Sequence, residues 1–189
     1  MFKKLENWLP STLVNEIDKV MSSDQIPWIY KATTVNPENV EELKYKFPHI
    51  EETHQFVHLL YDNGQAVSPL WEIVRPLIHF FEYHTNQTVV DIGRIKANML
   101  FQDSTVTTTH NTPHVDVYDD DWTSIVYYVN QADGDTVMFD EDLREMDRSK
   151  FAQGHAVYFP SNIMHSSSNP KNAYRRIVVN IVVKTKENK

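Results

Sequence analysis

The second half of the chain consists of short runs of apolar, β-branched and aromatic residues separated by turn residues. These runs cover residues 90–101, 114–117, 123–130, 136–139, 155–159, 163–167 and 175–184. Asp, Asn, Gly and Pro stand between them, and these residue types favour turns. Many short strands punctuated in this way predict a sandwich or a barrel. The charged stretch 141–149 fits either a short helix or an exposed loop.

The first half of the chain shows the apolar spacing of helices in two places. Residues 10–22 form one predicted helix, with Ser11 as the expected N-cap. Residues 68–83 form the second, in which Pro76 is expected to produce a kink. Shorter strand-like runs occupy residues 28–31 and 54–61. The helices are therefore expected to support a sheet that is built mainly by the second half.

Composition excludes several classes of protein. The 189 residues include no cysteine, which excludes disulfide frameworks and thiolate chemistry and leaves His, Asp and Glu as candidate metal ligands. With 18 basic and 26 acidic residues the net charge is −8, so we expect no nucleic-acid partner. No signal peptide or membrane-spanning run is recognisable. We therefore expect a cytoplasmic protein with no membrane partner.

Three residues in the strand-rich half have the side chains of a metal site. On an extended strand His114 and Asp116 project to the same side, because residues two apart share a face. His165 would join them from a distant strand. Two histidines and one carboxylate form the facial triad that leaves open positions on a non-haem Fe(II). His110 is a weaker candidate, because Pro113 disfavours the helix that would align it with His114.

Two adjacent arginines follow the third candidate ligand. The turn signal at Asn169-Pro170 predicts a hairpin with His165 on one arm and the arginines on the other. Arg176 shares a strand face with Asn180, as in a polar pocket, whereas the other residues on the Arg175 face are aliphatic. A guanidinium pairs well with a carboxylate. We therefore choose Arg176 as the carboxylate anchor and keep Arg175 as the alternative.

The strand over residues 123–130 offers a further contact for a bound carboxylate. Tyr128 shares a face with Ser124, Val126 and Asn130, and we expect this face to point into the barrel. A phenol there can donate a hydrogen bond to the carboxylate that the arginine binds.

Together these residues resemble the Fe(II)/2-oxoglutarate-dependent dioxygenases, in particular their prolyl-4-hydroxylase-like branch. His114, Asp116, His165 and Arg176 match the family's motif in order and approximate spacing, over a region from about 94 to 184. Residues 134–139 and 154–159 are similar to the two glycine turns of the family, except that Asp135 stands where the family has a second glycine.

The resemblance implies a fold and a set of cofactors. The fold is α+β and mainly β, a double-stranded β-helix (jelly roll) in one domain over 1–189, with helical support from 1–88 and the β-helix core in 89–185. Fe(II) would bind His114, Asp116 and His165. The co-substrate 2-oxoglutarate would bind Arg176 and Tyr128, O2 would be consumed, and ascorbate is a candidate stimulant. Asn98 would touch 2-oxoglutarate or substrate, or make a structural hydrogen bond.

The resemblance also implies a reaction, with several alternatives left open. Because Asp116 is present, it implies oxygenation rather than halogenation, with hydroxylation of a protein or peptidyl, prolyl-like substrate as the first expectation. A free amino acid or another small molecule is the alternative substrate. A cupin-type metalloenzyme without 2-oxoglutarate, and a non-catalytic metal-binding or structural module, are the alternative functions.

Overall fold

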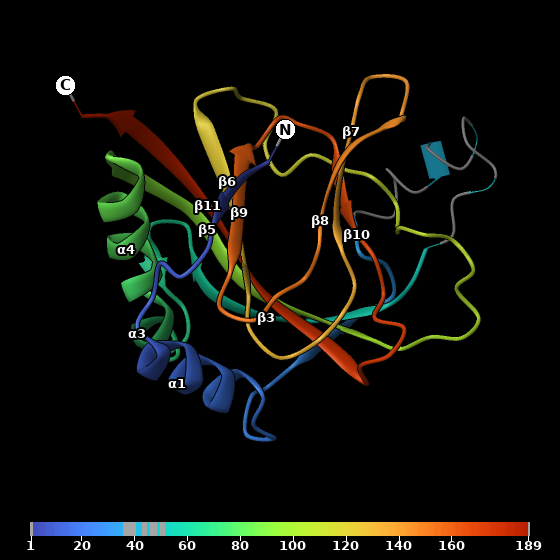
Figure 1. Cartoon of the computed structure of the whole chain (residues 1–189), viewed down its shortest axis with the longest axis horizontal. Helices are drawn as coiled ribbons and strands as arrows, with labels where there is room; N and C mark the ends of the chain where they lie inside the picture. The colour runs from blue at the N-terminus through green and yellow to red at the C-terminus, as the bar shows by residue number, and fades with distance from the viewer. Residues whose placement is uncertain (1, 36–40, 43–44, 46–48, 50–51, 189) are drawn as a thin grey trace.

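The computed structural model describes residues 2–35, 41–42, 45, 49 and 52–188. In this part of the chain eight strands form a large antiparallel sheet, and three form a small one (Figure 1). The large sheet has the order β1 (Lys3–Leu5), β9 (Ala156–Pro160), β6 (Trp122–Tyr128), β11 (Arg175–Glu187), β5 (Gln87–Phe101), β3 (Gln55–Asp62), β2 (Ile29–Lys31), and β4 (Gln65–Ala66) pairs with β3. The small sheet has the order β10 (His165–Ser167), β7 (Thr136–Phe139), β8 (Glu145–Ser149).

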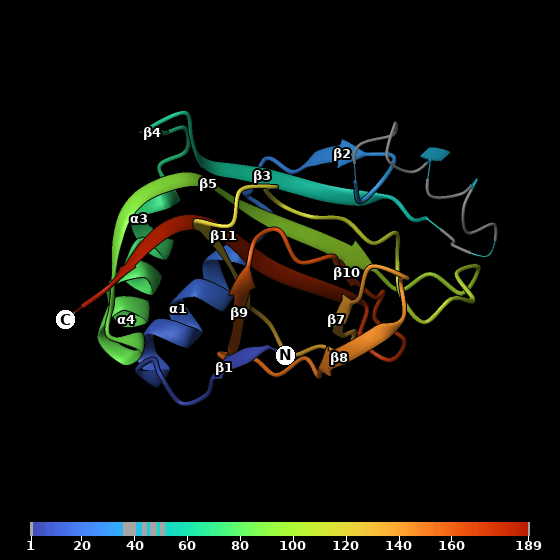
Figure 2. The same ribbon diagram turned by 90° about the horizontal axis from the view of Figure 1, so that it is seen from above.

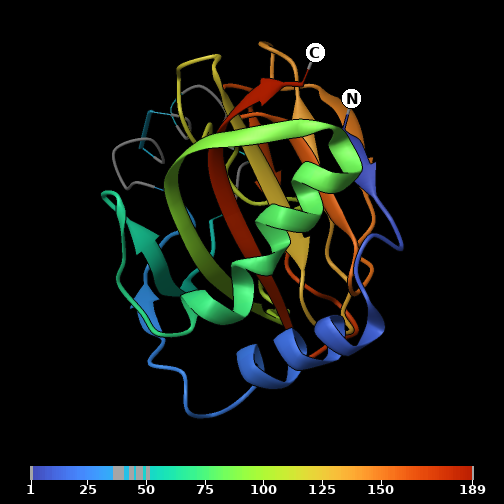
Figure 3. The ribbon, with the colours of Figure 1, turned by 90° about the vertical axis from the view of Figure 1, so that its left-hand side faces the viewer.

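The two faces of the large sheet pack against different partners. The helices α1 (Ser11–Met21), α3 (Trp71–Val74) and α4 (Pro76–Thr85) lie on the other side of the large sheet from the small sheet (Figures 1 and 2). Figure 3 shows α4 crossing in front of β11, with α1 along the lower ends of the strands. Along the central strands, successive side chains point to opposite faces of the sheet, because the strand period is two residues. Ile177 and Val179 join the helix-side core, whereas Val178 packs with Met138 of the small sheet.

Most predicted elements form, with local differences at the helices. Ser11 makes no capping hydrogen bond, because the chain enters the first helix through Pro10. The predicted helix over 68–83 is divided at Pro76 into α3 and α4, and Arg75 between them keeps helical dihedral angles. Proline has no N–H and its ring clashes with the preceding turn, so a new helix starts there more easily than the old one continues.

The first 88 residues supply more than helical support. The strands β1, β2, β3 and β4 all join the large sheet, and β3 pairs with β5 from Phe56 to Asp62. The stretch 141–149 is neither a helix nor simply an exposed loop, because Glu145–Ser149 pairs with β7 as β8. Within the described residues, no helix has both the length and the apolar character needed to cross a membrane.

Two local predictions around the candidate ligands are wrong. Residues 114–117 do not form a strand: His114 makes one isolated bridge with His165, and the chain then bends so that the Asp116 N–H donates to the Ser161 carbonyl at 3.1 Å. The predicted hairpin is also absent, because β10 pairs with β7 whereas β11 pairs with β5 and β6. The loop between β10 and β11 therefore crosses from one sheet to the other.

Candidate metal centre

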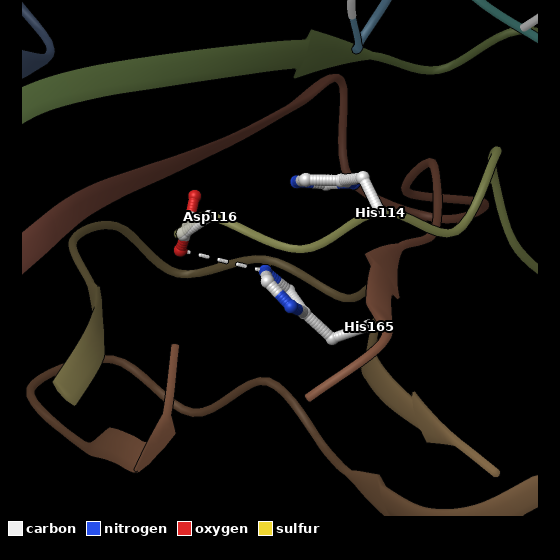
Figure 4. A group of neighbouring side chains, drawn as sticks. All are labelled: His114, Asp116 and His165. Carbon is white, nitrogen blue, oxygen red and sulfur yellow. Dashed lines mark ion pairs between the residues drawn. The ribbon is translucent and has the colours of Figure 1, made fainter. Parts of the chain in front are cut away.

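His114, Asp116 and His165 converge between the two sheets, although they come from three different backbone contexts. Their ligand atoms all lie within 4.8 Å of one another, and both imidazole rings point toward the Asp116 carboxylate (Figure 4). His114 and His165 are held in register by two backbone hydrogen bonds, each 2.8 Å long. The bend that ends at the Ser161 carbonyl then turns Asp116 toward the two rings. The three side chains thus form one compact donor set.

The backbone orients both imidazole rings. The Nδ1 of His165 lies 2.9 Å from the Ile163 carbonyl, and the Nδ1 of His114 lies 3.4 Å from the Thr112 carbonyl. A carbonyl can only accept, so each Nδ1 carries the proton and each Nε2 keeps a free lone pair. The Nε2 of His165 faces the Asp116 Oδ2 at 3.6 Å. Hydrogen bonds of this kind to the second ring nitrogen are typical of histidines that bind metals.

The Asp116 carboxylate is buried and surrounded by donors. Its Oδ2 accepts hydrogen bonds from the Ser124 hydroxyl at 2.7 Å and from the Asn180 amide at 3.1 Å. Its Oδ1 faces the Arg94 guanidinium at 3.3 Å. Two of these donors come from the central strands β6 and β11, so the sheet itself sets the orientation of the carboxylate.

The protonation states of this donor set suit a cation. Burial opposes ionisation of Asp116, but His165, His114 and Lys96 together hold the pKa of this carboxyl well below its usual range. Burial, with the neighbouring His165, lowers the pKa of His114 to about 3, so that this ring is neutral at pH 7. Metal binding requires an ionised carboxylate and neutral imidazoles, and Asp116 and His114 meet that requirement before any metal arrives.

Arg176 and Arg175 point to opposite faces of the large sheet. Arg176 lines the same cavity as His114 and His165, and its guanidinium donates to the Gly134 carbonyl and the Thr136 hydroxyl, each at 3.2 Å. Burial lowers the pKa of Arg176 to about 10, so the guanidinium remains charged at pH 7. Arg175 instead donates to the Ser22 carbonyl at 2.7 Å, beside the end of α1. Of the two arginines, only Arg176 faces the cavity.

Tyr128 stands behind Arg176 rather than beside the two histidines. Its hydroxyl donates to the Thr136 hydroxyl at 3.0 Å, and its ring stacks on Phe151 with centroids 4.5 Å apart. The Arg176 guanidinium lies 5.2 Å from the Phe151 ring centroid and 6.0 Å from that of Tyr128. Burial raises the pKa of Tyr128, so the phenol keeps its proton and remains a donor. Arg176 is thus enclosed by two rings and two hydrogen-bond acceptors.

Asn98 lines the cavity, but its amide already has a protein partner. Its Nδ2 donates to the Gln55 Oε1 at 2.6 Å, across the paired strands β3 and β5. Of the two roles expected for Asn98, contact with a ligand or a structural hydrogen bond, the structure contains the hydrogen bond. His110, the weaker ligand candidate, makes a 2.8 Å contact with the Asn111 carbonyl through Nδ1 and packs against Phe139.

Several residues of the site were missed by sequence reasoning. Lys96 lines the cavity, and Arg94 contacts Asp116. Both share the alternating face of β5 with Asn98, so the strand period already contained the signal for them. Thr136 and Gln55 had no such signal, because their neighbours in the site are distant in sequence.

Comparison with known proteins identifies the fold. No family model matches the chain, and no curated protein sequence does. An oxidoreductase of the 2OG-Fe(II) oxygenase family from Burkholderia pseudomallei superposes with a TM-score of 0.65 at 15% identity, over 96% of this chain and 85% of that one. A prolyl hydroxylase from Trichoplax adhaerens, in complex with a peptide fragment of hypoxia inducible factor, gives 0.53 at 13% identity, over 97% and 83%.

At these identities the similarity shows the fold alone. The chain has the double-stranded β-helix fold of 2OG-Fe(II) oxygenase structures, and the predicted fold class, mainly β with supporting N-terminal helices, is confirmed. A fold of this kind can host different functions. The function therefore depends on the side chains that this chain places in the fold.

Proposed function

We propose that the protein is an Fe(II)- and 2-oxoglutarate-dependent dioxygenase. One observation carries the proposal: His114, Asp116 and His165 bring their ligand atoms within 4.8 Å of one another beside a cavity that Arg176 also lines. A facial triad leaves open coordination positions, and a guanidinium in the same cavity is suited to bind a carboxylate. The fold of 2OG-Fe(II) oxygenase structures is consistent with this proposal.

The donor set fits Fe(II) better than it fits a structural role. A merely structural carboxylate would not need two imidazoles with free Nε2 atoms directed toward it, whereas a metal site does. Ser124 and Asn180 bind the Asp116 Oδ2, and a carboxylate has enough lone pairs to keep these hydrogen bonds while it binds a cation. His114, Asp116 and His165 would therefore hold the metal without rearrangement of the sheet.

Each remaining residue has a defined part in the proposed reaction. Fe(II) with 2-oxoglutarate and O2 would supply the oxidising chemistry that converts a C–H bond to C–OH, with release of succinate and CO2. Arg176 would bind the distal carboxylate of 2-oxoglutarate, and Thr136 would support it from the same side. Tyr128 would hold Thr136 in place through its hydroxyl, and could also turn this donor toward the carboxylate. Val126 and Val178 line the cavity and would exclude water from the carbon chain.

Hydroxylation is the reaction we propose, with ascorbate as a candidate stimulant of turnover. A peptidyl, prolyl-like substrate is the first candidate by analogy, since the Trichoplax adhaerens prolyl hydroxylase is described with a bound peptide. A free amino acid or another small molecule is the second.

Anaerobic titration with Fe(II) in the presence of 2-oxoglutarate tests the proposal directly. The expected result is the weak visible charge-transfer absorbance of an Fe(II)–2-oxoglutarate chelate, which His165→Ala should abolish. His84→Ala removes an exposed imidazole from α4 and is the matched control that should keep the absorbance. A colourless wild-type protein, or a His165→Ala variant that retains the band, would contradict the proposal.

Two rival functions give different outcomes in simple assays. A cupin-type enzyme that needs no 2-oxoglutarate would bind metal but show no 2-oxoglutarate chelate. A non-catalytic module would form no succinate from 2-oxoglutarate under air, even with Fe(II) and ascorbate. Slow succinate release without added substrate would support the dioxygenase over both.

A further inference from the structure

The cavity beside the candidate metal centre is lined by cations and by no carboxylate within the described part of the chain. Lys96 and Arg176 are the two cations, and the other lining residues are neutral polar, histidine or aliphatic. The chain as a whole carries a net charge of −8, so the cavity has the opposite sign to the molecule. Two partly desolvated cations favour anionic ligands in this cavity.

Among the described residues, the one carboxylate that attracts Lys96 is Asp116. Its ammonium group forms no hydrogen bond or ion pair with any described residue. The carboxylate that acts on it is Asp116, whose two oxygens already accept hydrogen bonds from Ser124, Asn180 and Arg94. Binding of a metal would engage Asp116 further. Lys96 is therefore left as a half-buried cation that faces the cavity without a counter-ion of its own.

Two further cations, Arg94 and Lys31, lie near Lys96 and add positive charge around it. Arg94 lies two residues away on the same face of β5, and its Nε is buried without a hydrogen-bond partner among the described residues. Lys31 lies at the end of β2, paired with the cavity-lining Gln55, and is exposed.

The two cations start from different levels of the sheet. On paired strands Lys96 is opposite Asn180, whereas Leu100 is opposite Arg176. Four residues separate these two levels, which is roughly 13 Å along a strand. Arg176 is fixed at its own end by Gly134 and Thr136. Lys96 lies at the level of Asn180, whose amide binds Asp116, and so belongs to the metal end of the cavity.

We propose that Lys96 is a binding site for a carboxylate of the primary substrate, so that the enzyme oxidises a small carboxylic acid rather than an uncharged peptide segment. This inference rests on the proposed function, because it assigns the Arg176 end to 2-oxoglutarate and the Lys96 end to the substrate. A lone ammonium is a point charge suited to a monoanion, whereas a phosphate dianion usually recruits several donors.

Acetate, with acetamide as its neutral counterpart, tests the subsite without knowledge of the natural substrate. The full-length protein is loaded with Zn(II), saturated with 2-oxoglutarate and titrated with either probe, while the signals of 13C-labelled lysine side chains are followed by NMR. Lys96→Met identifies the Lys96 signal by its loss. Lys19→Met removes the same charge from the exposed face of α1 and is the matched control.

We expect acetate, but not acetamide, to shift the Lys96 signal to saturation in the wild type. Because Lys96→Met lacks this signal, acetate binding to the variant and to the wild type is compared through the NMR signal of 13C-labelled acetate. It should weaken at least tenfold in the variant, as expected for loss of a hydrogen bond to a charged group, and 2-oxoglutarate affinity should stay within twofold. Equal effects of acetate and acetamide, or no saturation, would overturn the inference. A Lys96→Met variant that instead loses 2-oxoglutarate affinity would reassign Lys96 to the co-substrate. Absence of the Fe(II)–2-oxoglutarate absorbance in the wild type would reject the proposed function itself.

Discussion

The cations at the two ends of the cavity, Arg176 and Lys96, differ in the number of protein groups that contact them. Arg176 is enclosed by two hydrogen-bond acceptors and two aromatic rings, so its position is set before any ligand binds. Lys96 faces the cavity without a partner among the described residues. A preorganised group loses little conformational entropy on binding, whereas an unpartnered cation gains most from a ligand of opposite charge. Arg176 is thus held in place by the protein, whereas the Lys96 ammonium group is not.

The largest expected effect is at the anchored end. Arg176→Met should raise the dissociation constant of 2-oxoglutarate about a hundredfold, because two charge-assisted hydrogen bonds to the distal carboxylate would be lost. The measurement is anaerobic titration of the Fe(II)-loaded protein by chelate absorbance. Arg175→Met is the matched control and should keep 2-oxoglutarate affinity, since Arg175 contacts the Ser22 carbonyl beside α1. If the two variants behaved alike, the distinction between the two sheet faces would not hold.

At the metal end of the cavity, we expect His114 to make the stability of the protein depend on pH. In the folded, metal-free protein the pKa of His114 is about 3, against an ordinary value near 6.5. Below pH 6.5, His114 therefore becomes protonated in the unfolded chain but stays neutral in the folded chain. The free energy of unfolding falls as pH decreases toward 3. The slope from this residue is at most about 1.4 kcal/mol per pH unit.

His114→Gln should remove that part of the slope. The check is urea unfolding of wild type and variant at pH 6.5 and pH 5, with a chelator present. We expect the difference in free energy of unfolding between the two proteins to change by about 2 kcal/mol over this interval. Parallel curves would mean that His114 titrates normally in the folded state. Arg176 should add no slope here, because its pKa of about 10 keeps it charged throughout.

The smallest effect should come from the residue that orients Asp116. Ser124→Ala removes the 2.7 Å hydrogen bond to the Asp116 Oδ2 and nothing from the cavity lining. Metal affinity should fall about tenfold, as is typical for loss of a group that orients a ligand, while 2-oxoglutarate affinity of the remaining metal-loaded protein is unchanged. Thr123→Ala on the other face of β6 is the control. An unchanged metal affinity would leave Ser124 with a packing role only.

The alternation of side chains along a strand (strand parity) accounts for most of what could be predicted about the site. The alternation in residues 123–130 and 175–184 correctly separated the inward Ser124, Tyr128 and Arg176 from the core residues on the opposite face. Parity depends only on the local backbone period, so it can be read from a single segment. The same alternation on β5 would have predicted that Lys96 and Arg94 share a face with Asn98.

Strand pairing could not be predicted in the same way. The turn at Asn169-Pro170 favoured a hairpin, yet β10 and β11 lie in different sheets, and Asp133 fixes the loop between them by accepting the N–H groups of Lys171, Asn172 and Ala173. Likewise, residues 114–117 are extended enough to form a strand but are bent by Ser161. Both outcomes depend on partners that are distant in sequence.

The sequence by itself determined which residues are the candidate metal ligands, the face on which Arg176 lies and the mainly β fold class, because residue type and strand period are local properties. The tertiary structure alone decided that His114, Asp116 and His165 meet within 4.8 Å, that Tyr128 reaches the cavity through Thr136, and that Lys96 faces it without a partner among the described residues. These facts depend on which strands become neighbours. Burial of apolar side chains across the whole chain selects those neighbours, and no single segment carries that information.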